Sequence, residues 1–211
     1  ALQQTEWEYG ERSVRTALRM LGAETSAAPP SATADGPVRI ELSVSKTNVT
    51  VAEPFSLKAS LKNTGNKDLR LAGRETFFAR HLRIYSAQGT YILRVRQSPD
   101  YEPTIEDFPS VPRDGQILID ESCIVTVEEA PTKIWPEIME RQKVFVLQGF
   151  SDSWAFDVES YEPAKAFDLL LVVVHEPVDS SMLGRLGIQQ SVPTAQIVSN
   201  CVRLRVHDND K

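Results

Sequence analysis

The segment VAEPFSLKASLKNTGNKDLRL, residues 51–71, decides the fold class because apolar and polar residues alternate along it. The polar positions of its first half are Ser and Lys, and the apolar positions are Phe55, Leu57, Ala59 and Leu61. A period of two residues places one row of side chains on each face of a β-strand. The segment therefore predicts an antiparallel strand with one face in the core and one in solvent.

The alternation stops at NTGNKD, residues 63–68, and then begins again. Gly65 can adopt a positive φ, and Asn63 can hydrogen-bond its own backbone, so this stretch predicts a tight turn. A slip of one residue in strand pairing would expose the whole apolar row, so the register is strongly specified.

Other segments have the same strand character, and Gln88-Gly89 between two of them predicts a hairpin. These segments are 38–45, 81–87, 90–96, 117–128, 143–150, 167–175 and 196–206. Residues 169–174, LLLVVV, are apolar on both faces, which predicts a central strand that is covered on both sides.

The N-terminal part has a different period. Residues 6–24 carry Trp7, Val14, Leu18 and Leu21 at helical spacing, which predicts an amphipathic helix. A stretch rich in Pro, Ala and Ser follows and is typical of a linker.

The predicted fold is therefore all-β: an antiparallel β-sandwich with an N-terminal amphipathic helix and a short helical insertion that begins at Pro136. The predicted organisation is an N-terminal helix (1–25), a linker (26–37), the sandwich (38–207) and a tail (208–211).

Three long loops interrupt the strands, at residues 97–115, 130–142 and 176–194. Loops of this length in a compact domain are uncommon and are often functional. Aromatic residues in or beside them are candidate binding residues, because exposed aromatic rings form recognition surfaces: Tyr101, Phe108, Trp135 and Trp154. The alternative is that these rings fold back as small apolar clusters under the loops.

The net charge of −6 and the pI of about 5.2 weigh against nucleic-acid binding, which depends on Lys and Arg that neutralise phosphates. No apolar run approaches the length of about 20 residues that a transmembrane helix needs, so no transmembrane segment is expected.

Catalytic signatures are not found: the chain has no G-x-S-x-G, H-E-x-x-H, P-loop or G-x-G-x-x-G motif. His81, His175 and His207 lie far apart in the sequence, and a zinc site would require the fold to bring all three together. We therefore expect no enzyme, no metal and no cofactor.

The two cysteines have opposite phases. Cys123 shares the phase of Val125 and is expected to face the core, whereas Cys201 has the phase opposite to Val202. Regular strands would then point the thiols to different sides, so a Cys123–Cys201 disulfide is not expected unless a bulge at residues 199–200 reverses Cys201.

The segment from residue 42 to residue 71 resembles the opening of immunoglobulin-like domains that are common in exported bacterial proteins, with Ala52-Glu53-Pro54-Phe55 where those have Gly-Glu-Pro-Phe. The ending, FDLLLVVVH and IVSNCVRLRV, resembles the terminal strands of the same domains, so the likeness covers residues 38–206. A weaker likeness, carried by the N-x-G turn and by residues 81–95, is to the bacterial intracellular proteinase inhibitor family.

Immunoglobulin-like domains of this kind serve as spacers, adhesion modules, binding units and inhibitor scaffolds, and fold alone does not choose among these functions. The resemblance implies a non-catalytic binding module that takes a protein or a cell-surface glycan. Protease inhibition and carbohydrate binding or adhesion are the alternatives.

A small residue at the start of ALQQ is what signal-peptide cleavage leaves, so we expect a periplasmic or extracellular protein; a trimmed intracellular protein would look the same. The sequence does not indicate the oligomeric state.

Overall fold

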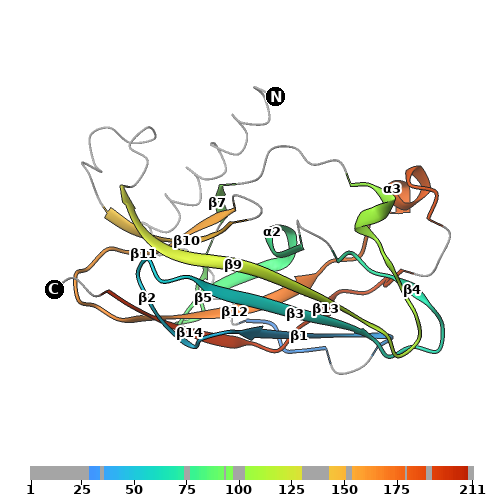
Figure 1. Ribbon diagram of the computed structural model, residues 1–211, viewed down its shortest axis with the longest axis horizontal. Coiled ribbons are helices and arrows are strands. Elements are labelled where there is room, and N and C mark those ends of the chain that lie inside the picture. Colours follow the sequence, from blue (N-terminus) through green and yellow to red (C-terminus); the bar gives the residue numbers. More distant parts are fainter. Residues whose placement is uncertain are drawn as a thin grey trace.

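The computed structural model describes residues 29–33, 36–73, 77–92, 94–96, 103–129, 143–150, 154–178, 180–188 and 192–208. These residues form mostly β-strands, arranged in sheets that are almost entirely antiparallel (Figure 1). The predicted N-terminal helix, the predicted insertion helix at Pro136 and the last residues of the tail lie outside the described residues.

The first sheet has six strands in the order β1-β3-β9-β10-β11-β7, and every neighbouring pair is antiparallel. Its strands are β1 (Val38–Val44), β3 (Phe55–Asn63), β7 (Arg94–Arg96), β9 (Gln116–Glu129), β10 (Lys143–Gly149) and β11 (Ala155–Ser160).

The second sheet has the order β2-β14-β12-β5-β6, with β13 also paired to β12. Its strands are β2 (Asn48–Thr50), β5 (Leu82–Ser86), β6 (Tyr91–Ile92), β12 (Phe167–His175), β13 (Ile197–Val198) and β14 (Val202–His207). The β2–β14 pair is parallel, in contrast to the purely antiparallel expectation. The chain passes from β1 in the first sheet to β2 in the second and returns at β3, so the two sheets are tied together within a few residues.

Short elements complete the described part of the chain. They are the strands β4 (Leu69–Arg70) and β8 (Ser110–Val111), which pair with each other, the helices α2 (Phe77–His81) and α3 (Ser180–Arg185), and the 3-10 helix η1 (Ile105–Asp107). No helix in this part of the chain combines the length and the apolarity that crossing a bilayer requires.

Strand β3 confirms the prediction made from its alternation. All four apolar residues of the row are buried, at 3% exposure or less, whereas Lys58 and Lys62 are exposed. Burial of such side chains contributes about 1.5 to 3 kcal/mol each for the larger ones. The strand lies between β1 and β9, so neighbouring strands flank its inward row on both sides.

The turn after β3 is organised by Asn63, whose side chain is fully buried. Its Oδ1 accepts a hydrogen bond from the Gly65 N–H at 2.9 Å, so the predicted bond to the backbone is confirmed. Gly65 itself does not adopt a positive φ. A Cβ there would lie 3.1 Å from the Cβ of Pro37, so close approach is the reason that glycine suits this position.

The two sheets share one core. Phe145 of β10 and Phe167 of β12 pack with ring centroids 4.8 Å apart, and the core cluster contains residues of both sheets. Trp154 lies against Gly149, where a Cβ would be 2.4 Å from the indole ring. The fold is therefore sandwich-like, with the apolar faces of the sheets turned toward each other.

Strand β12 is central, as its apolar run predicts: it lies between β14 and β5. Leu169, Leu171 and Val173 belong to the main core. Val172 and Val174 form a second small cluster with Val198 of β13, so both faces of the strand are buried.

The structure differs from the sequence prediction in several short elements. Residues 90–96, expected to form one strand, divide into β6 in the second sheet and β7 in the first. Strands β2, β8 and β11, helices α2 and α3 and the 3-10 helix η1 were not predicted. Elements of two to six residues offer too few side chains for a period to be recognised.

Candidate binding surface

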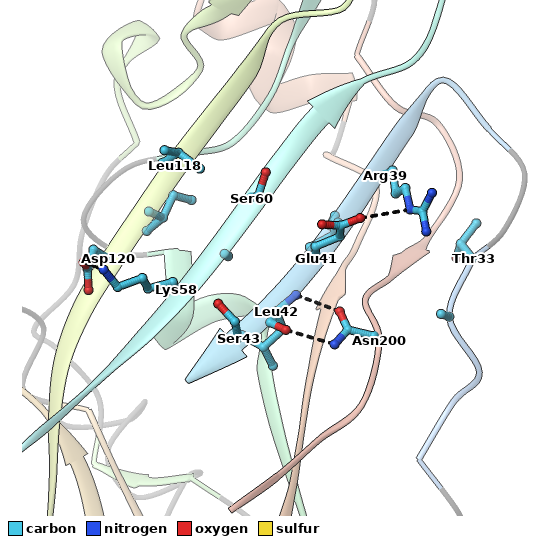
Figure 2. A pocket seen from close by; sticks show the side chains of 14 residues that line it. Thr33, Arg39, Glu41, Leu42, Ser43, Lys58, Ser60, Leu118, Asp120 and Asn200 are labelled. Carbon is cyan, nitrogen blue, oxygen red and sulfur yellow. Dashed lines mark hydrogen bonds and ion pairs between the residues drawn. The ribbon is translucent and has the colours of Figure 1, made fainter. Parts of the chain in front are cut away.

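The outward side chains of β1, β3 and β9 form the candidate binding surface. Strand pairing aligns them in rows, because Glu41 is opposite Ser60 and Ser60 is opposite Leu118. In the next row Lys58 lies between Ser43 and Asp120. Since the alternate residues of these strands are in the core, these side chains project from the other side of the sheet (Figure 2).

This face forms the floor of a hollow of about 710 Å³, which we call the β1–β3–β9 hollow. Thr33 and Asn200 lie along its β1 side (Figure 2). The Thr33 N–H donates to the Val198 carbonyl, and the Thr33 Oγ1 accepts from the Val198 N–H, both at 2.9 Å. The Asn200 amide bonds the N–H and the carbonyl of Leu42 at 2.8 and 2.9 Å. Segments that are distant in the sequence therefore build this side of the hollow.

The charged groups in the hollow form two ion pairs. Lys58 Nζ lies 2.8 Å from Asp120 Oδ2, and Arg39 Nε lies 3.4 Å from Glu41 Oε1. All four side chains are more than half exposed, so each pair contributes at most about 1 kcal/mol to stability. The two positive and two negative charges compensate each other, so a partner can cover this face without facing an excess of either charge.

Leu118 is the large apolar residue of the hollow that is exposed to solvent, with 72% of its surface accessible. Ile105 and Phe150 are the other exposed large hydrophobic residues in the described part of the chain. Leu118 is not among the binding residues predicted from the sequence, although the strand period contains a signal for it. Cys123 faces the core, and Leu118 lies an odd number of positions away on the same strand, so Leu118 faces outward.

The predicted aromatic residues do not form an exposed surface where the structure describes them. Trp154 is fully buried and meets Phe156 edge-on, with ring centroids 5.7 Å apart. Phe108 is also buried, and its carbonyl accepts a hydrogen bond from Arg70 Nη1 at 2.6 Å. These two rings therefore pack inward, as in the alternative interpretation. Tyr101 and Trp135 lie outside the described residues.

The two cysteines are free thiols, Cys123 buried and Cys201 exposed at the start of the β14 segment. Burial raises the pKa of both thiols, so each is protonated at neutral pH. Because the thiolate is the reactive form, neither cysteine is activated as a nucleophile in this arrangement.

Two of the three histidines come together in the fold. The rings of His81 and His175 stack with centroids 4.7 Å apart, although sequence distance suggested no such contact. Within the described residues there is no group of three or more His, Cys, Asp or Glu side chains with the spacing of a metal site.

Comparisons with protein-family models, with curated proteins and with solved structures find no match. The interpretation of the β1–β3–β9 hollow therefore depends on its own geometry and chemistry.

Proposed function

We propose that this protein is a non-catalytic binding module whose immunoglobulin-like β-sandwich presents the β1–β3–β9 hollow to a protein partner. The observation that carries the proposal is Leu118, which is 72% exposed in a hollow whose charges compensate each other. An apolar contact with a polar surround matches the usual anatomy of a protein–protein interface.

Strand order supports the immunoglobulin-like part of the proposal. Immunoglobulin domains place strands C, F and G in one sheet and strands A, B, E and D in the other. The run β14-β12-β5 follows the order G-F-C, and β1-β3-β9 begins as A-B-E does. Strands β10, β11 and β7 then extend the first sheet beyond that pattern.

A protein partner is favoured over a cell-surface glycan by the side chain that the hollow offers. Leu118 provides an aliphatic contact, whereas a sugar ring gains most from stacking on a flat aromatic ring. Export to the periplasm or the cell exterior belongs to the same proposal and is supported by the resemblance to domains of exported proteins.

The test is a selection of peptides on the immobilised protein from a random display library, in parallel with a glycan array. Leu118→Glu is expected to weaken the binding of the selected peptides by about tenfold or more, because a charge replaces the apolar contact. Ile105→Glu is the matched control, since Ile105 is also exposed but does not line the hollow. Failure to select a saturable binder, or equal binding to both variants, would contradict the proposal.

A further inference from the structure

A pair of histidines closes one end of the core. His175 ends the inward row of β12 and is 1% exposed, and His81 ends α2 directly before β5. Their rings stack at an interplanar angle of 14°, and the Phe77 ring lies 4.9 Å from that of His81. The stack thus joins α2 to the C-terminal end of β12.

The stack is suited to neutral rings. Among the described residues, no group has the distance and angle of a hydrogen bond to either ring nitrogen of His175 or to Nδ1 of His81. Backbone groups of residues 174–176 lie close enough to favour protonation of the rings, but burial outweighs them and lowers the pKa of both. A buried imidazolium without a partner is strongly disfavoured. A shared metal ion does not suit this geometry either, because nearly parallel rings direct their in-plane lone pairs side by side instead of toward one point.

Charged groups around the stack lie on three elements. Arg80 of α2 and Arg83 of β5 oppose a positive charge on His81, whereas Glu176 after β12 favours one on His175. The Glu176 carboxylate accepts hydrogen bonds from Gln196 Nε2 at 2.9 and 3.1 Å. Strand β13 presents no charge, because its two residues, Ile197 and Val198, are apolar.

We propose that the His81–His175 stack is an acid-sensitive contact that holds α2 against the end of β12 and releases it when the rings take up protons. Release would bring Phe77 and Phe78 of α2, which are buried in the closed structure, into solvent. The released form would therefore present a new apolar surface at low pH. This inference does not depend on the proposed binding function of the β1–β3–β9 hollow.

The direction of the pH effect follows from the two histidines. Burial, followed by the charge of its neighbours, lowers the pKa of His81 to about 3, and burial lowers the pKa of His175. The released form therefore binds more protons than the closed form between about pH 6.5 and pH 3. The neutral rings therefore stabilise the closed form above about pH 6.5, and this stabilisation is lost as the pH falls. For His81 alone the ratio of released to closed protein rises about 30-fold from pH 7.5 to pH 5.

Hydrogen exchange measured by mass spectrometry tests the proposal on the unmodified protein. After correction for intrinsic rates, residues 77–81 are expected to lose protection between pH 7.5 and pH 4.5, while β3 and β9 keep theirs. Unchanged protection of residues 77–81 would overturn the proposal. Simultaneous loss in β3 and β9 would also overturn it, because that result describes global acid unfolding.

His175→Phe provides the matched variant, because a ring with no hydrogen-bond partners can be replaced by phenyl without losing a hydrogen bond. It is expected to shift the midpoint of α2 release downward by about 1 pH unit or more. His207→Gln is the control, since His207 lies on β14 and is not part of the stack. An equal midpoint for wild type and His175→Phe would refute the role of the stack.

If His175→Phe fails to fold, NMR titration of histidine-labelled wild type tests the same proposal. Ordinary titration of both rings in the closed protein would refute the acid sensitivity of the stack.

Discussion

At the scale of single residues, Asn63 organises the turn after β3 and its contact with the segment around β8. The two N–H groups of its Nδ2 are shared among three backbone carbonyls at 2.9 to 3.1 Å, those of Lys67, Val111 and Pro112. Together with the bond from Gly65 N–H to Oδ1, these contacts satisfy a fully buried amide. One side chain thus connects the turn after β3 with the segment around β8.

Asn63→Asp is expected to destabilise the protein by about 3 kcal/mol or more, because a carboxylate cannot donate to the three carbonyls and would be buried among them. Urea denaturation followed by circular dichroism measures this loss. Asn66→Asp, at an exposed position of the same turn, is expected to change stability by less than about 0.5 kcal/mol. Equal effects of the two substitutions would show that the Asn63 contacts do not stabilise the fold.

Some of these residue-scale features were predictable. The phase of the alternation assigns the inward row of β3 and also places Leu118 outward. The partners of Asn63 at Val111 and Pro112 were not predictable, because they lie 48 and 49 positions away and are brought to it by the pairing of β3 with β9.

At the scale of elements, the free edge of β1 is closed by a side chain. The Asn200 amide binds both backbone groups of Leu42, as a residue of a neighbouring strand would. An unprotected strand edge invites pairing with other chains, so this contact protects the edge while it joins the two sheets.

Asn200→Ala is expected to reduce the free energy of unfolding by about 1 to 2 kcal/mol, because two backbone groups at a partly buried edge lose their partner. Thermal unfolding measures the change. Asn48→Ala, which removes an exposed asparagine from β2, is the control and is expected to have a much smaller effect. A loss no greater than that of the control would contradict the role of Asn200.

The long strands were predictable because each contains several repeats of the two-residue period. The division of residues 90–96 between two sheets was not predictable. Both halves continue the same alternation, and the change of partner between β6 and β7 depends on β5 and β11, which lie elsewhere in the chain.

At the scale of the whole molecule, the two sheets depend on one shared core. Phe145 and Phe167 contact each other from opposite sheets. Neither sheet can bury its apolar face without the other, so the two sheets are expected to unfold as one unit.

Phe145→Ala is expected to lower the free energy of unfolding by about 3 to 5 kcal/mol, because apolar burial is lost and a cavity remains between the sheets. Chemical denaturation followed by circular dichroism and by tyrosine absorbance is expected to show coincident transitions. Phe150→Ala removes an exposed ring next to the same strand and is expected to cost less than about 1 kcal/mol. Separate transitions for the two probes would contradict a single shared core.

The sequence by itself determined that the chain forms β-strands and which face of each long strand is buried, because both follow from the local two-residue period. It also determined that residues 169–174 form a central strand, because a strand that is apolar on both faces must be covered on both. Only the tertiary structure decided the order of the strands, the hollow over β1, β3 and β9, and the contact between His81 and His175. These features join residues far apart in the chain, and the choice of partner depends on how the whole set of apolar faces packs together.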